Sequence, residues 1–240
     1  MNSSLPDDLC RDLVLANRIL YDQQIVDGLG HVSARHPADP GLFLLSVNRA
    51  PGLVRRRDIT AYRLDGSAVD PEAPRPYLER FIHAEIYRAR PDVMSVVHSH
   101  SMGVIPFACT GTPLRPMFHM AGFLGEGAAQ FDIRETAGDT DLLISSSYLG
   151  QALARSLGGR SCVLMRGHGS TVVGTSLQQA VYRAIYAEAN ARLQLSAATL
   201  GETTFLTPEE SRLAAAANDG QIPRSWALWV QRLGDIDLDR

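Results

Sequence analysis

Residues 90–101 read RPDVMSVVHSHS, a valine-rich run that ends in two histidines separated by one serine. The part from Asp92 to Val97 is typical of a short buried strand, because β-branched residues favour strands. Side chains two positions apart on a strand point to the same face, so His98 and His100 are expected to project together. Two imidazoles on one face commonly present neutral nitrogens to a metal ion. A hydrogen-bonded pair of core histidines is the alternative.

The helix that precedes this strand is expected to supply a third ligand. Apolar residues recur at helical spacing over residues 78–89, and Pro91 ends the helix shortly before the strand. Glu79 can therefore return to the strand's end, where its carboxylate could act as a ligand, a general base or both. His83 lies on the same helix face, and we expect it to orient Glu79 or another ligand. A solvated surface glutamate is the alternative.

His168 is the expected fourth ligand. It stands between Gly167 and Gly169, whose backbones can take dihedral angles closed to other residues. This places the histidine at the tip of a predicted hairpin between strands 163–165 and 171–173. A surface turn that happens to contain histidine is the alternative. The combined pattern predicts a site for one divalent ion (zinc, manganese or iron) whose ligands are Glu79, His98, His100 and His168.

The other predicted elements place this site in a sheet covered by helices. Asp65-Gly66, directly after the strand predicted over residues 59–64, is a hairpin turn signal. Acidic residues favour a helix start near Pro6. Further strands are predicted over residues 31–35, 43–47 and 59–64. Further helices are predicted over residues 7–27, 102–108, 148–157 and 176–200, and from Pro208 and Ser225. The pattern indicates an α/β fold with a mixed sheet.

Composition and charge narrow the functional classes. The chain has 240 residues, 45% hydrophobic, and a formal net charge of −3. This length fits one domain over residues 1–240, and the charge argues against a nucleic-acid partner, which usually requires a basic face. The three cysteines (Cys10, Cys109 and Cys162) have no CxxC spacing, which favours a reduced, cytoplasmic protein. No apolar run approaches a membrane span, so no membrane partner is expected.

Three stretches together resemble the class II aldolase/adducin family, which includes metal-dependent sugar-phosphate aldolases. They are GLGHVSAR at 28–35, LERFIHAEIYRARPDVMSVVHSHS at 78–101 and LMRGHGSTVVG at 164–174. The resemblance implies a three-layer α/β/α fold with a mixed, mainly antiparallel central sheet. It also implies metal binding by His98, His100 and His168, with Glu79 as a ligand or the catalytic acid/base. A homotetramer with sites at subunit interfaces is common in the family.

The chain departs from the sugar-phosphate aldolases where those enzymes cradle the substrate phosphate. It has Gly30-His31 in place of a glycine-asparagine pair, Asn48-Arg49 in place of a threonine-glycine element, and Tyr77-Leu78 in place of paired serines. Tyrosine and leucine cannot copy two serine hydroxyls, so a phosphorylated sugar is not expected as the substrate. The changed elements GHVSAR, NRAP, YLERFIH and RPMFHMAGFLG look like a branch of the family that decarboxylates hydroxylated aromatic dicarboxylates.

The predicted function is therefore a metal-dependent carbon–carbon lyase of aromatic compound catabolism. Its substrate would be an ortho-hydroxy aromatic dicarboxylate such as 3,4-dihydroxyphthalate or a hydroxypyridine dicarboxylate, chelated to the metal through its phenolic oxygen and carboxylate. Glu79, with a pKa raised by burial, is the first candidate for the acid that protonates the ring, and His119 is the second. Substrate contacts are predicted for His31, Arg49, Arg80 and Arg115, each of which could instead be structural.

Three other functions are alternatives for a chain of this family. A class II aldolase acting on a non-phosphorylated hydroxy-keto acid would use the same metal and release an aldehyde or ketone. A non-catalytic adducin-like interaction module would lack the metal, and the retained histidines argue against it. An oxygenase on the same fold would consume oxygen.

Overall fold

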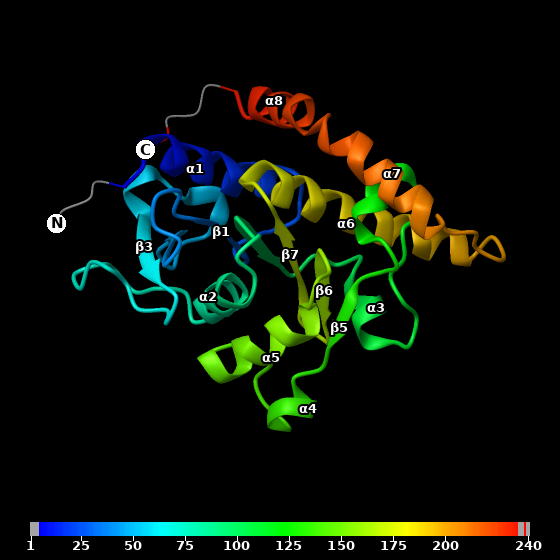
Figure 1. Ribbon diagram of the computed structural model, residues 1–240, viewed down its shortest axis with the longest axis horizontal. Helices are drawn as coiled ribbons and strands as arrows, with labels where there is room; N and C mark the ends of the chain where they lie inside the picture. Colours follow the sequence, from blue (N-terminus) through cyan, green and yellow to red (C-terminus); the bar gives the residue numbers. More distant parts are fainter. Residues whose placement is uncertain (1–4, 235–237, 239–240) are drawn as a thin grey trace.

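The computed structural model describes residues 5–234 and residue 238. Its centre is a seven-stranded sheet in the order β3-β2-β1-β4-β7-β6-β5 (Figure 1). Neighbouring strands run antiparallel, except that β5 and β6 are parallel. The strands are β1 (His31–Arg35), β2 (Leu42–Ser46), β3 (Ile59–Arg63), β4 (Ser95–Ser99), β5 (Ala129–Phe131), β6 (Cys162–Met165) and β7 (Gly169–Gly174).

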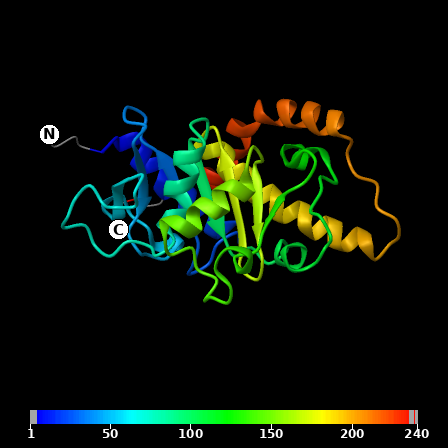
Figure 2. The same cartoon turned by 60° about the horizontal axis from the view of Figure 1, so that its bottom comes forward.

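Helices cover the sheet on both faces, as Figures 1 and 2 show. Helices α1, α6 and α8 lie on one face, and α2 and α5 lie on the other. The helices are α1 (Asp7–Asp22), α2 (Arg80–Ala89), α3 (Ile105–Cys109), α4 (Arg134–Ala137), α5 (Ser147–Leu157), α6 (Leu177–Ala198), α7 (Pro208–Asp219) and α8 (Ile222–Arg232). Short 3-10 turns are η1 (Pro51–Leu53), η2 (Arg56–Asp58) and η3 (His119–Leu124).

Two apolar clusters, one on each face of the sheet, hold these layers together. Val97 of β4 packs in the cluster formed with α1 and α6, whereas its neighbour Val96 packs in the cluster formed with α2 and α5. This alternation follows from the two-residue period of a strand. His98, two residues after Val96, therefore lies on the same face as α2, and the strand carries it toward the start of that helix.

The predicted three-layer α/β fold with a mixed, mainly antiparallel sheet is confirmed. Some boundaries differ. Helix α1 ends at Asp22 rather than near Asp27, because Gln24 adopts a left-handed φ of 57° that a helix cannot continue. The histidine strand is Ser95–Ser99 rather than 92–97, so His100 follows the strand. Strand β5 was not predicted, since three residues are too few for a strand period.

Among the described residues, no helix combines the length and apolar character needed to cross a bilayer.

Candidate metal centre

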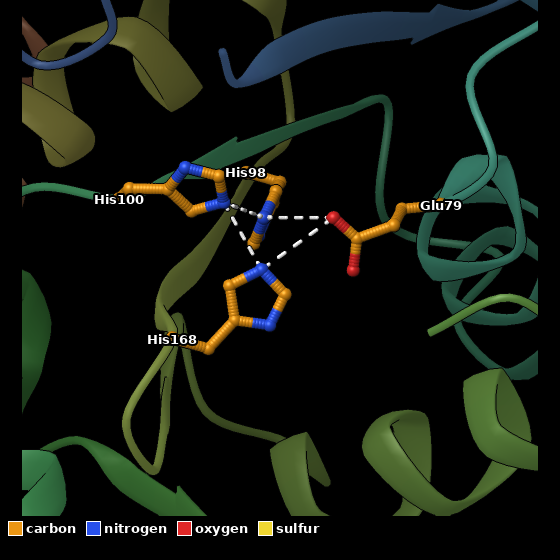
Figure 3. Close-up of side chains that lie close together, drawn as sticks. All are labelled: Glu79, His98, His100 and His168. Carbon is orange, nitrogen blue, oxygen red and sulfur yellow. Dashed lines mark hydrogen bonds and ion pairs between the residues drawn. The ribbon is translucent and has the colours of Figure 1, made fainter. Parts of the chain in front are cut away.

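Four side chains converge where β4, β7 and the start of α2 meet (Figure 3). One ligand atom from each of Glu79, His98, His100 and His168 lies within 4.8 Å of the others. The His100 Nε2 atom is 3.3 Å from His98 Nε2 and 3.0 Å from His168 Nε2. The Glu79 Oε2 atom is 3.6 Å from His98 Nε2 and 3.5 Å from His168 Nε2. The sequence therefore identified a set of residues that the fold does bring together.

Secondary structure explains why these four residues meet. Strands β4 and β7 are paired with His98 opposite Thr171, which places the β6–β7 turn beside the end of β4. His168 occupies that turn after Gly167, whose φ of 65° is the left-handed conformation that the tight reversal needs. Glu79 is the N-cap residue of α2, so its side chain leaves the helix at the end that faces β4.

Hydrogen bonds on the far side of His168 and Glu79 fix the orientation of these two ligands. The Nδ1 atom of His168 lies 2.9 Å from the Leu142 carbonyl oxygen, which can only accept. The proton is therefore on Nδ1, and the Nε2 lone pair faces the cluster. The backbone N–H of Ile144 donates to Glu79 Oε1 at 2.9 Å, which leaves Oε2 for the cluster. One loop between α4 and α5 thus orients two ligands.

The donor set fits a divalent transition-metal ion. Atoms at the corners of a tetrahedron whose centre-to-corner distance is about 2.1 Å, the usual zinc–nitrogen bond, lie ~3.4 Å apart. Four of the six separations between the ligand atoms, 3.0 to 3.6 Å, bracket that value, and all six are within 4.8 Å. Three imidazole nitrogens and one carboxylate also suit zinc, manganese and iron, so the residues do not select among these ions.

The electrostatic environment keeps Glu79 ionised. Burial alone would raise the pKa of Glu79, but the neighbouring His98 and His168 imidazoles outweigh it, so this pKa lies well below its usual range. The expectation of a raised pKa was therefore wrong, because it counted burial and not the neighbouring imidazoles. Burial lowers the pKa of His98 to about 3 and also lowers that of His100. Burial opposes protonation of His168 too, but Glu79 raises its pKa.

His31 and His83 border the cluster. His31 is opposite His98 in the β1–β4 pairing, and their ring centroids are 5.0 Å apart. His83 was expected to orient Glu79 or another ligand. Its two ring nitrogens instead lie 2.7 Å from His31 Nδ1 and 2.6 Å from Ser33 Oγ. The sequence placed His83 on the correct face of α2, but its recorded hydrogen bonds go to β1.

The elements that differ from the sugar-phosphate aldolases lie around His31. Tyr77 is buried, its ring centroid is 4.7 Å from that of His31, and its hydroxyl donates to the Arg49 carbonyl oxygen. Leu78 is largely exposed. A tyrosine ring therefore occupies the space beside His31.

The other predicted substrate residues make contacts elsewhere. Arg49 pairs with Asp58 at 3.1 Å, and Arg80 donates to the Gly66 carbonyl oxygen at 2.7 Å. The Arg115 guanidinium stacks over the Phe205 ring. His119 is exposed on η3, where its carbonyl oxygen accepts from Asn218. No contact between these four and the metal cluster is recorded in the described part of the chain.

A cavity of about 690 Å³ adjoins the cluster at His100. Its walls include Tyr21, Ile25, Met102 and Arg192, together with Asp22 and Asp27. Both acids have partners of their own, since Asp22 lies 3.4 Å from Arg232 and Asp27 accepts from the Leu29 backbone.

Arg192 is a site residue that the sequence did not single out. Its Nε donates to Glu188 at 2.7 Å, and buried Glu188 also accepts from Ser101 and from the Gly103 backbone just after His100. The four-residue spacing of the glutamate and arginine on one helix was the available signal.

The chain is similar to several proteins of known name. The chain is 39% identical to Decarboxylase tropJ from Talaromyces stipitatus over 93% of both chains. It is 32% identical to a 3,4-dihydroxyphthalate decarboxylase from Rhodococcus jostii, over 78% of this chain and 79% of that protein. The chain is therefore similar to named decarboxylases, as the sequence motifs indicated.

Solved structures agree with the fold. An L-fuculose 1-phosphate aldolase from Glaciozyma antarctica superposes with a TM-score of 0.79 at 22% identity, over 98% of this chain and 92% of that one. An aldolase II superfamily protein from Pseudomonas syringae gives a TM-score of 0.80 at 20% identity, over 99% and 97%. The family described as Class II Aldolase and Adducin N-terminal domain matches residues 11–195. Sequence motifs, fold and relatives lead to one conclusion: the chain belongs to the class II aldolase and adducin family.

Proposed function

We propose that the protein is a metal-dependent decarboxylase of an ortho-hydroxy aromatic dicarboxylate, with 3,4-dihydroxyphthalate as the reference substrate. The observation that carries the proposal is the convergence of Glu79 with three histidines in a chain whose relatives include decarboxylases along most of its length. The buried Tyr77 ring beside His31 supports a flat organic substrate over a phosphorylated sugar.

The residues of the chain have separate tasks in this reaction. A divalent ion would be held by Glu79, His98, His100 and His168. When bound, it supplies a Lewis acid that stabilises negative charge on a substrate oxygen. The cavity beside His100 is large enough for a substituted benzene ring, since ligand pockets begin at about 300 Å³. Arg192 lines it and offers a guanidinium, which matches the geometry of a carboxylate.

Decarboxylation replaces a carboxylate by a proton on one ring carbon. The carbon–carbon bond breaks, its electron pair stays with the ring, and the carbon receives a proton from an acid. Glu79 serves first as a ligand, because its low pKa keeps it ionised. His119 is exposed on η3 and makes no recorded contact with the cluster within the described residues, so it stays the second predicted acid. Arg49, Arg80 and Arg115 remain predicted carboxylate partners.

The test is carbon dioxide release from 3,4-dihydroxyphthalate by protein reconstituted with zinc, manganese or iron. The metal-stripped protein and the His98→Ala variant should release none, and His36→Ala, a histidine outside the cluster, should match the unaltered chain. The dihydroxybenzoate formed identifies the carboxylate that leaves. Metal-bound protein that releases no carbon dioxide, but forms an aldehyde or ketone from hydroxy-keto acids, would make the chain an aldolase instead.

A further inference from the structure

Four buried polar side chains form a hydrogen-bonded chain from the metal centre into the core under α2. His31 Nδ1 lies 2.7 Å from His83 Nε2, and His83 Nδ1 lies 2.6 Å from Ser33 Oγ. Ser33 Oγ in turn lies 2.7 Å from the Tyr87 hydroxyl. None of the four residues is more than 3% exposed. Each contact therefore needs a proton from one side, with no water to replace it.

The inner end of the chain sets the direction of these hydrogen bonds. Ser33 is the only recorded acceptor for the Tyr87 hydroxyl among the described residues, because the other polar group that acts on it, the Val96 backbone N–H, can only donate. A buried hydroxyl that donates to nothing loses its solvation without compensation. The Tyr87 hydroxyl therefore donates to Ser33.

The remaining protons follow by counting. Ser33 has two recorded side-chain partners and receives a proton from Tyr87, so its own hydroxyl donates to His83 Nδ1. An imidazole whose Nδ1 accepts is neutral only with its proton on Nε2. His83 Nε2–H then donates to His31 Nδ1, which must carry no proton. His31 is consequently neutral as well, with its proton on Nε2. Burial agrees, because it lowers the pKa of His83 to about 3.

The Nε2–H group of His31 lies across the ring from the Nδ1 atom that meets His83. The ring of His31 lies beside that of His98, and no protein acceptor for its Nε2 is recorded in residues 5–234. We propose that Tyr87, Ser33 and His83 are positioning residues that hold His31 as a fixed neutral donor, whose Nε2–H binds an anionic oxygen of the substrate at the metal centre. The identity of that oxygen, carboxylate or phenolate, rests on the proposed function; the direction of the chain does not.

A matched pair of variants separates the donor from the packing. His83→Leu removes the proton donor to His31 at similar volume, and His83→Gln restores an amide N–H. We expect His83→Leu to lower kcat/KM for 3,4-dihydroxyphthalate by about 10- to 100-fold, the range for a hydrogen bond to a charged group, at unchanged metal content. His83→Gln should recover most of that loss. Ser33→Ala, which removes little volume, should behave like His83→Leu because it frees the tautomer of His83.

Nitrogen-15 spectra of histidine-labelled protein test the chain without a substrate. The His31 resonances are assigned by their loss in His31→Gln, in both zinc-loaded and metal-free protein. We expect the proton on Nε2, and a tautomer mixture in Ser33→Ala. A proton on Nδ1 would overturn the inference, as would equal activity losses in His83→Leu and His83→Gln. If the protein decarboxylates nothing, the spectra still decide the direction of the chain, so the two proposals fail separately.

Discussion

Arg192 lies at the cavity wall because another residue of the same helix holds it there. Buried Glu188 binds its Nε at 2.7 Å, while the Nη nitrogens have no recorded partner among the described residues. The Glu188 carboxylate also fixes the loop after His100 through the Gly103 backbone. Glu188 thus positions both the loop after His100 and the Arg192 guanidinium on the same side of the cavity.

Replacement of this cation should weaken substrate binding. We expect Arg192→Gln to raise KM for 3,4-dihydroxyphthalate about tenfold, since a charged hydrogen bond is lost, with a smaller change in kcat. Arg212→Gln is the matched control, because Arg212 pairs with Glu209 at 2.6 Å on the exposed surface of α7. Steady-state kinetics of the two variants check this; equal KM values would remove Arg192 from the substrate site.

The sequence identified the residues whose side-chain type alone indicates a function. Histidines and a glutamate at ligand spacing point to a metal, whatever their partners are. Ser33 and Tyr87 have no such signal, because their role comes from a hydrogen bond between positions 54 residues apart. The low pKa of Glu79 was likewise hidden, because it depends on imidazoles from two other segments.

The β6–β7 hairpin packs directly against the end of β4. A Cβ atom on Gly169 would lie 2.9 Å from the His100 Cα and would overlap the Ser99 carbonyl oxygen. Both neighbours are backbone atoms, which cannot rotate away as a side chain can. The close approach therefore makes glycine the residue that lets His100 and His168 meet.

Substitution at this contact should loosen the metal centre. We expect Gly169→Ala to lower the free energy of unfolding by about 1–3 kcal/mol, the usual cost of overpacking, and to weaken metal binding. Gly159→Ala is the control, since its added Cβ meets nothing within 4 Å. Urea unfolding and metal titration of both variants provide the measurement. Unchanged metal affinity in Gly169→Ala would mean that the hairpin position does not govern the site.

Elements with strong local signals were predicted closely. The helices predicted over residues 148–157 and 176–200 correspond to α5 and α6, which Ser146 and Ser176 cap. The end of α1 was not found because local backbone hydrogen bonds turn the chain there, and strand β5 was not found because it depends on a tertiary contact. Ile25 and Val26 both donate to the Leu20 carbonyl oxygen as the chain turns, and β5 exists through its pairing with β6.

The buried histidines make the stability of the folded molecule depend on pH. Their pKa values in the fold, about 3 for His83 and His98, lie below the ~6.5 of an unfolded chain. Between these values the unfolded state binds more protons, so stability falls as pH falls below about 6.5. His168 opposes this trend, because its raised pKa favours the folded state on acidification.

Metal-free protein should therefore lose stability between pH 7.5 and pH 5. At pH 5, each of the two histidines lowers the free energy of unfolding by up to about 2 kcal/mol. The urea midpoint, measured in chelator, should fall over this range, and His83→Gln should show a shallower fall because one of these histidines is gone. A midpoint that stays constant in the unaltered chain would show that the histidines titrate normally in the fold.

The metal ligands and the cavity wall belong to different parts of the backbone. The sheet, the start of α2 and one hairpin supply the ligands, whereas the chain after α1, the loop after His100 and one turn of α6 supply much of the wall. Loops accept substitutions with less loss of stability than strands do. A lineage can therefore exchange its cavity wall and retain its ion. Such mutational independence gives descendants of one ancestor a direct route to different reactions, which accords with relatives named both aldolase and decarboxylase.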